Sequence, residues 1–188
     1  FGPKFRLFAS GGARLDPDVY TDMTNLGFMV IEAYGLTETS PAATFNPVGR
    51  QKAGSIGVPI PDVEVRISDP DATGMGEIAI KGPNVMLGYY KKPAATAEVI
   101  RDGWFYTGDL GYKDKDGYFF ITGRSKEMIV LSTGKKIFPD ELENFYKQLP
   151  SIKEICMIQT DRGLEAAVVP DFDYLRKMNI ANARETIA

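Results

Sequence analysis

A run of hydroxyl and carboxyl side chains follows a predicted strand near the start of the chain. The run is Tyr34-Gly35-Leu36-Thr37-Glu38-Thr39, and it comes directly after the apolar segment 28–33 (FMVIEA). Hydroxyls beside a carboxylate at the end of a strand can hold phosphate oxygens and a magnesium ion, a hard cation that prefers oxygen ligands. The alternative is a helix cap, with Ser40 as the capping residue and Pro41 in the first turn. The chemistry of these residues alone favours the cap, because capping motifs are common and sites are few, but the two interpretations are compatible.

A second carboxylate, Asp109, ends the segment Trp104-Phe105-Tyr106-Thr107-Gly108-Asp109. We expect an aromatic strand here, followed by a glycine turn that carries the aspartate. An ionised aspartate only accepts hydrogen bonds, so it suits a pair of donor hydroxyls such as a ribose diol; an ordinary turn aspartate is the simpler alternative. Asp114 and Asp116 resemble the start of a calcium loop. The other EF-hand ligands are missing, so a hairpin turn at Asp116-Gly117 is favoured.

The composition excludes several other kinds of chemistry. The 188 residues include no histidine, which removes Ser-His-Asp hydrolases, Cys-His proteases and His-ligated metal sites. A hydrophobic content of 44% with 25% charged residues suits globular units rather than a disordered chain. The chemistry must therefore come from carboxylates, hydroxyls, lysine, arginine, backbone amides or an oxygen-bound cation.

Charge and cysteine content limit the partners and the compartment. The formal net charge is -3 with no long basic run, so we expect no nucleic-acid partner. No apolar stretch approaches the roughly 20 residues that cross a bilayer, so we expect no transmembrane segment. The single cysteine, Cys156, cannot form an internal disulfide, which fits a cytoplasmic protein.

The first fifty residues are typical of an α/β layer. Segment 4–9 (KFRLFA) reads as a strand that ends at Ser10-Gly11-Gly12, and segment 28–33 reads as a second strand. Between them, Asp16 is expected to cap a helix with Pro17 in its first turn. Strand, helix and strand with glycine turns indicate a parallel arrangement.

The remainder of the chain changes character twice. Residues 55–122 predict a small antiparallel, barrel-like part, with strands at 63–67, 76–80, 103–106 and 118–122 and a short helix at 93–100. Beyond the polar connector 123–127 the pattern is α+β. Its predicted elements are a strand at 128–131, a turn at 133–136, a helix at 139–149 carrying an apolar face, strands at 154–159 and 165–169, and a helix from Tyr174 onward.

Taken in order, these segments resemble the adenylate-forming superfamily of acyl-CoA synthetases, luciferases and peptide-synthetase adenylation domains. The matching blocks are Ser10-Gly11-Gly12-Ala13, YGLTETS (34–40), GSIGVPIP (54–61), GEIAIKGPNVMLGYYKKP (76–93), DGWFYTGDLG (102–111) and GRSKEMIVLSTGKKIFPDELE (123–143). Six blocks in this order and spacing make a specific signal, which extends to about residue 170. The form LSTGKKIFPDELE resembles the long-chain fatty acyl-CoA synthetase branch most.

The resemblance implies a fold in three parts. Residues 1–125 would be the C-terminal part of the large AMP-binding domain, with an α/β portion at 1–50 and a β-rich subdomain at 51–125. Residues 126–188 would be an incomplete α+β C-terminal domain.

The resemblance also implies an ATP or AMP site. The Tyr34 ring would pack against adenine, with Gly35 in the same loop and the backbone of Gly12 and Ala13 on the other side of the base. From the residues alone, the Gly11-Gly12-Ala13 run would let a flat ring lie against bare backbone, although a tight turn explains it equally well.

Phosphate, metal and ribose contacts follow from the same resemblance. Thr37 would bind phosphate and Glu38 would bind Mg²⁺, so these two are the candidate catalytic residues. Asp109 would accept both ribose hydroxyls, with Arg124 alongside.

The resemblance places CoA chemistry near the second domain. Lys126 matches the hinge between the large and small domains, and Thr133 and Gly134 fall in the loop that would line the path of CoA. The family's phosphate loop does not occur upstream of Tyr34, and its C-terminal adenylation lysine does not occur either. The 188 residues alone are therefore expected to hold half a site, to need a missing N-terminal part of the same chain and to be inactive.

The expected parent reaction uses a carboxylic acid, most simply a fatty acid, with ATP, Mg²⁺ and CoA. It gives acyl-AMP and pyrophosphate first, and acyl-CoA and AMP after CoA attack. Two alternatives stay open: an adenylation domain that passes its acyl group to a carrier protein, and a non-catalytic nucleotide-binding module.

Overall fold

The computed structural model describes residues 2, 4–13, 15–131, 136–160 and 163–180. These residues belong to two compact units, Phe1–Thr122 and Gly123–Ala188. The sequence predicts the division three residues later, between 125 and 126.

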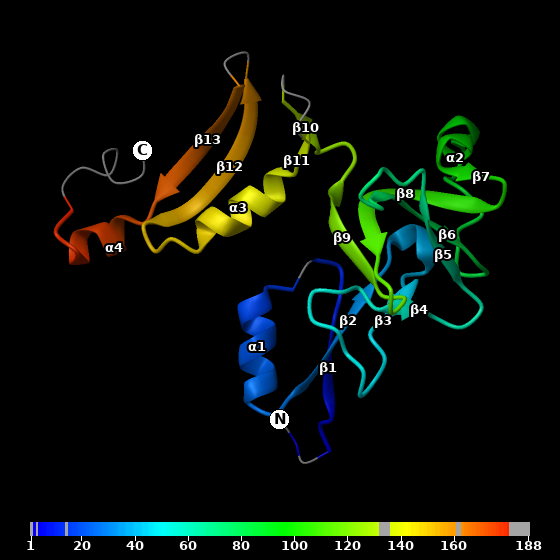
Figure 1. Ribbon diagram of the computed structural model, residues 1–188, viewed down its shortest axis with the longest axis horizontal. Coiled ribbons are helices and arrows are strands. Elements are labelled where there is room, and N and C mark those ends of the chain that lie inside the picture. Colours follow the sequence, from blue (N-terminus) through cyan, green and yellow to red (C-terminus); the bar gives the residue numbers. More distant parts are fainter. Residues whose placement is uncertain (1, 3, 14, 132–135, 161–162, 181–188) are drawn as a thin grey trace. The chain divides into compact units, whose positions relative to one another are not determined.

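The first unit begins with a parallel strand pair and a helix beside it (Figure 1). Strand β1 (Leu7–Ser10) pairs in parallel with β2 (Met29–Tyr34), so Ser10 lies opposite Glu32. Helix α1 (Pro17–Asn25) connects them, and the Asp16 carboxylate caps it by accepting from two backbone amides, at 2.8 and 3.3 Å. The predicted strand–helix–strand layer is confirmed.

After β2 the chain turns back on itself. A 3₁₀ helix, η1 (Thr37–Thr39), precedes the short antiparallel strands β3 (Thr44–Phe45) and β4 (Val58–Pro59). The predicted helix after a Ser40 cap is wrong. Ser40 has the left-handed φ of 52° and ends η1, and the chain continues into β3.

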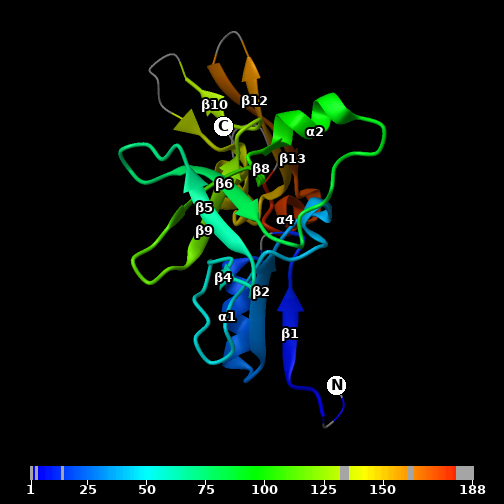
Figure 2. The ribbon, with the colours of Figure 1, turned by 90° about the vertical axis from the view of Figure 1, so that its right-hand side faces the viewer.

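The β-rich part is a curled five-stranded sheet (Figure 2). Its strands run in the order β5 (Glu64–Ser68), β6 (Gly76–Lys81), β8 (Trp104–Lys113) and β7 (Ile100–Arg101), with β9 (Phe119–Arg124) paired to β8, and α2 (Pro93–Val99) precedes β7. Alternation along these strands buries Ile78, Ile80, Phe105 and Phe119. The predicted mixed fold with a barrel-like β part is confirmed.

The β8–β9 hairpin contains the two aspartates that resemble a calcium loop. Its turn is closed by the Asp114 amide donating to the Tyr118 carbonyl at 2.9 Å. Lys52 binds both carboxylates, that of Asp114 and, at 2.9 Å, that of Asp116. The hairpin interpretation is confirmed, and both carboxylates form ion pairs with Lys52.

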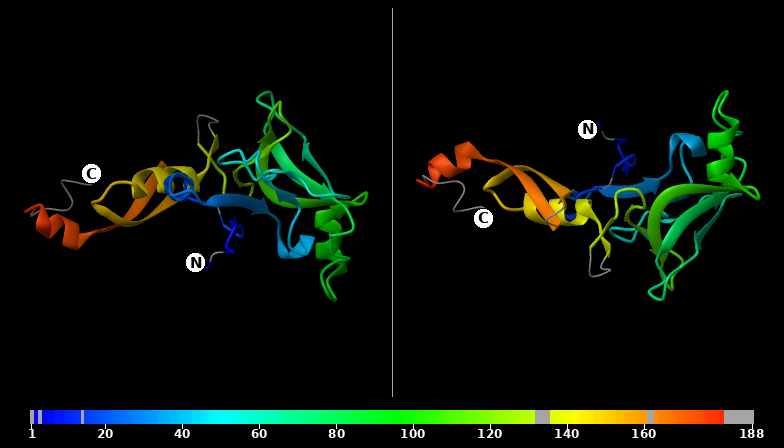
Figure 3. Two further views of the ribbon diagram at one scale, coloured as in Figure 1. Left: turned by 90° about the horizontal axis from the view of Figure 1, so that it is seen from below. Right: turned by 90° about the horizontal axis from the view of Figure 1, so that it is seen from above.

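The second unit is a helix against a β hairpin, visible as the yellow helix beside the orange strands (Figure 3). Strands β12 (Ile152–Thr160) and β13 (Gly163–Pro170) pair antiparallel, and α3 (Pro139–Lys147) packs on β12. Its other elements are β10 (Ile129–Val130), β11 (Lys136–Ile137) and α4 (Phe172–Lys177). The apolar face predicted for α3 is mostly exposed within this unit, since Phe145 is 65% exposed.

Among the residues that the structure covers, no helix has both the length and the apolar character needed to cross a membrane.

Candidate active site

Two loops meet at the carboxyl ends of β1 and β2. Parallel strands end at the same edge of a sheet, so the loop after Ser10 and the loop after Tyr34 are neighbours. A Cβ on Gly11 would lie 3.2 Å from the Ala33 carbonyl oxygen, which shows how closely the first loop approaches β2. Gly12 has a φ of +85°, and its backbone and that of Ala13 are exposed. This edge of the sheet therefore presents bare backbone beside Tyr34.

The loop after β2 depends on Gly35. A Cβ at this position would lie 1.8 Å from the Pro41 carbonyl oxygen, so only glycine fits where the loop closes. The closure is completed by the Ala43 amide, which donates to the Tyr34 carbonyl at 2.8 Å.

The hydroxyls on either side of Glu38 have different environments. Thr39 is fully buried, and its Oγ1 accepts from the Leu36 amide at 2.8 Å, which holds the 3₁₀ turn. Thr37 is exposed and Glu38 is half-buried. Thr39 is therefore a structural residue, while Thr37 and Glu38 are accessible to a ligand.

Glu38 has a tyrosine partner that sequence analysis missed. The Tyr89 hydroxyl donates to Glu38 Oε1 at 2.9 Å. Burial raises the pKa of the Tyr89 hydroxyl, and the hydrogen bond to the Glu38 carboxylate raises it further, so the hydroxyl remains a donor at neutral pH. The available signal was the position of Tyr89 inside the block GEIAIKGPNVMLGYYKKP, but nothing in that block indicates its partner.

Asp109 lies inside a strand, not on a turn that follows one. Strand β8 continues from Trp104 to Lys113, and its pairing with β6 shifts register between Glu77 and Ala79. A bulge absorbs the extra residues of β8, and Gly108 adopts a φ of +76° there. The glycine that predicts a turn is therefore the glycine of a bulge.

The bulge fixes the backbone on both sides of the carboxylate. The Gly108 amide donates to Glu77 Oε1 at 2.8 Å, and the Asp109 amide donates to Thr107 Oγ1 at 3.0 Å. Thr107 in turn donates to the Ile78 carbonyl at 2.8 Å. Asp109 is only 7% exposed, so its carboxylate is held in a defined place.

The structure brings Tyr34 and Asp109 together. The Tyr34 hydroxyl donates to Asp109 Oδ2 at 2.5 Å, although the two residues are 75 positions apart. Both side chains are buried, Tyr34 being 9% exposed. A charge-assisted hydrogen bond of this kind orients the carboxylate and the ring at once.

The remaining predicted residues belong to the second unit. Arg124 ends β9, and its carbonyl accepts from the Glu127 and Met128 amides at 3.1 Å each, which closes a turn around Lys126. Arg124 and Lys126 are exposed. Thr133 and Gly134 lie outside the described residues.

This arrangement suits a phosphorylated ligand better than a protein-only metal site. Among the residues that the structure describes, no group of three or more His, Cys, Asp or Glu side chains is arranged to hold a metal ion. Glu38 could contribute one carboxylate oxygen to Mg²⁺, an ion that commonly completes its shell with water and substrate phosphates. The residues present therefore fit a cation that arrives with a nucleotide.

Comparison with known proteins agrees with this chemistry. A family model described as AMP-binding enzyme matches residues 1–90. The long-chain-fatty-acid–CoA ligase of Escherichia coli O6:H1 is 36% identical over 173 residues, covering 88% of this chain and 31% of that ligase. The probable 4-coumarate–CoA ligase 2 of Dictyostelium discoideum is 39% identical over 193 residues, covering 97% of this chain and 35% of that protein.

A solved structure has the same fold. The O-succinylbenzoate coenzyme A synthetase of Bacillus subtilis, in complex with ATP and magnesium ion, matches with a TM-score of 0.80 and 30% identity, covering 91% of this chain and 38% of its own. The chain thus spans about a third of the length of the proteins it matches.

Proposed function

The chain belongs to the family of adenylate-forming, AMP-binding enzymes, and from that membership we propose that it is part of an ATP-dependent acyl-CoA ligase. The proposed reaction joins a carboxylic acid to AMP with release of pyrophosphate, after which CoA displaces AMP to give acyl-CoA. Adenylation is needed because a free carboxylate has no viable leaving group. The main structural support for the proposal is the buried hydrogen bond between Tyr34 and Asp109, which lie in the same compact unit.

We propose that the nucleoside of ATP binds at the carboxyl edge of β1 and β2. The exposed backbone of Gly12 and Ala13 and the ring of Tyr34 would contact adenine, and Gly35 allows the loop to close behind the ring. Asp109, already oriented by Tyr34, would accept hydrogen bonds from the ribose hydroxyls.

Phosphate binding is assigned to the accessible part of η1. Thr37 would donate its hydroxyl to a phosphate oxygen. Glu38 would supply a carboxylate ligand to Mg²⁺, which when bound neutralises charge on the phosphoryl oxygens. The accessibility of Thr37 and Glu38, beside the buried Thr39, supports this assignment.

We assign the second half-reaction to movement of the second unit. Lys126 lies in a hydrogen-bonded turn near the start of that unit, where a few dihedral angles could absorb a rotation. Thr133 and Gly134 would then line the CoA path.

We propose a fatty acid as the acid. The form LSTGKKIFPDELE and the similarity to long-chain-fatty-acid–CoA ligases support this choice. The sequence identity to a probable 4-coumarate–CoA ligase is comparable, so a test must also include an aromatic acid.

The test is product analysis with the full-length protein. It would be incubated with ATP, Mg²⁺ and CoA, and with either palmitate or 4-coumarate, and the products separated by mass spectrometry. We expect AMP and palmitoyl-CoA in equal amounts. Formation of ADP, or transfer of the acyl group only to an added carrier protein, would contradict the proposal.

A further inference from the structure

Segment 82–89 contacts the 3₁₀ turn that carries Glu38. The Asn84 side-chain amide donates to the Thr39 carbonyl at 3.2 Å and to the Ala42 carbonyl at 2.8 Å. The Met86 amide donates to the Glu38 carbonyl at 2.8 Å. With the Tyr89 bond to Oε1, the segment therefore holds Glu38 by its backbone and by its side chain.

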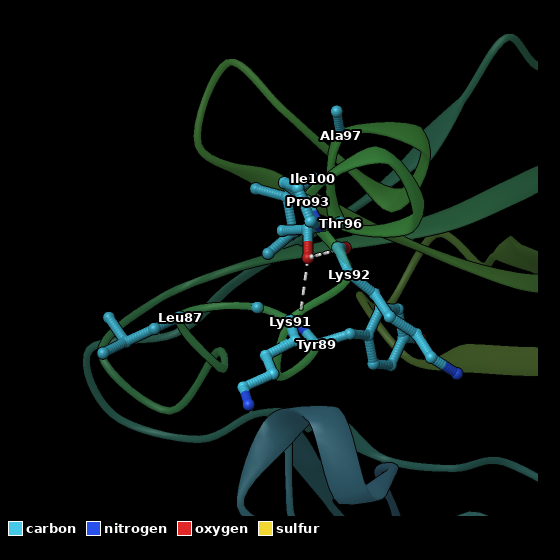
Figure 4. A pocket seen from close by; sticks show the side chains of 9 residues that line it. Leu87, Tyr89, Lys91, Lys92, Pro93, Thr96, Ala97 and Ile100 are labelled. Atoms are coloured by element: carbon cyan, nitrogen blue, oxygen red, sulfur yellow. Dashed lines mark hydrogen bonds between the residues drawn. The ribbon is translucent and has the colours of Figure 1, made fainter.

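The backbone of Tyr89 is held in place by a residue of α2. Its amide donates to Thr96 Oγ1 at 2.9 Å, and Thr96 Oγ1 donates to the Lys92 carbonyl at 3.0 Å (Figure 4). Gly88 has a φ of +147°, and a Cβ there would lie 2.7 Å from Thr96 Cγ2. The backbone of Tyr89 is thus anchored independently of Glu38.

The Tyr89 hydroxyl restricts the orientation of the Glu38 carboxylate. In the part of the chain that the structure describes, no other side chain has a hydrogen bond to the Glu38 carboxylate. Tyr89 also lines an open hollow of about 500 Å³. Because its backbone is anchored through Thr96, loss of the hydroxyl removes the hydrogen bond to Glu38 without releasing the backbone of Tyr89. Glu38 is half-buried and would rotate among several rotamers without this bond.

We propose that Tyr89 is a positioning residue for the magnesium-binding carboxylate. It occupies Oε1 and leaves Oε2 to ligate the cation that accompanies ATP. Tyr89 acts through Glu38 and does not itself touch the nucleotide. This inference rests on the proposed function, because Glu38 needs a cation to bind.

The experiment compares Tyr89→Phe with Tyr118→Phe in the full-length protein. Tyr118 is a matched control, because its hydroxyl also makes a hydrogen bond, to the Arg50 carbonyl at 2.6 Å, on the β8–β9 hairpin. Binding of a non-hydrolysable ATP analogue is measured by calorimetry over a range of Mg²⁺ concentrations. We expect Tyr89→Phe to raise the Mg²⁺ concentration for half-maximal binding by about three- to tenfold, and Tyr118→Phe to leave it unchanged.

A second pair of variants separates positioning from general stability. In a Glu38→Gln background, Tyr89→Phe should add no further change in Mg²⁺ dependence, since the charged ligand is already lost. An additional shift there, or an unchanged Mg²⁺ dependence in Tyr89→Phe alone, would overturn the positioning role. Absence of Mg²⁺-dependent nucleotide binding in the unsubstituted protein would overturn the proposed function as well.

Discussion

Replacement of Tyr34 by phenylalanine tests the link between the adenine and ribose contacts. The change removes only the hydroxyl that donates to Asp109 Oδ2 at 2.5 Å and keeps the ring. Both groups are buried, and a hydrogen bond to a charged group contributes about 1.5–3 kcal/mol. We expect Tyr34→Phe to lower the free energy of unfolding by about this amount and to raise KM for ATP about tenfold or more, because Asp109 loses its orientation.

The assay pairs urea unfolding with steady-state kinetics on the full-length protein. Tyr118→Phe is again the control, because it also removes a hydroxyl hydrogen bond, in this case to a neutral carbonyl, so we expect a loss of about 1 kcal/mol and an unchanged KM for ATP. A change in stability without a change in KM in Tyr34→Phe would show that the bond has no role in nucleotide binding.

Two further substitutions test other parts of the account. Lys52 holds the pKa of Asp114 below its ordinary value by hydrogen bonding, so this pair stabilises the fold above pH 3.8 and its contribution is lost as the pH falls through the lowered pKa. Asp114→Asn should therefore lower Tm at pH 7, with a difference that disappears at strongly acidic pH; a constant difference would contradict the linkage. Lys126→Pro should abolish thioester formation from supplied acyl-AMP and largely preserve pyrophosphate exchange, because proline restricts the turn. Equal loss of both half-reactions would show that Lys126 has only a structural role.

Short sequence motifs predict the elements that are fixed by contacts between residues near one another in the sequence. Asp16 and Pro17 predict the start of α1 because capping depends on neighbours three residues apart. Asp116-Gly117 predicts the hairpin for the same reason.

Two predictions were wrong because strand pairing and loop closure override the local sequence pattern. Gly108 is typical of a turn, but pairing of β8 with β6 makes its positive φ part of a bulge. Ser40 and Pro41 are typical of a helix start, but Ser40 ends η1 in a left-handed conformation and the Pro41 carbonyl lies against Gly35.

The sequence predicts which residues form the candidate site but not the hydrogen bonds between them. The block resemblance selects Tyr34, Glu38 and Asp109, whereas the Tyr34–Asp109 and Glu38–Tyr89 bonds join segments separated by 75 and 51 positions. No spacing rule reaches that far, because such pairs form only when the sheets assemble.

Acid-dependent exchange of pyrophosphate into ATP by the full-length protein tests the central claim most directly. We expect exchange that requires Mg²⁺ and a fatty acid and proceeds without CoA, since adenylation precedes thioester formation. A protein that binds ATP but exchanges pyrophosphate with neither fatty nor aromatic acids would contradict it.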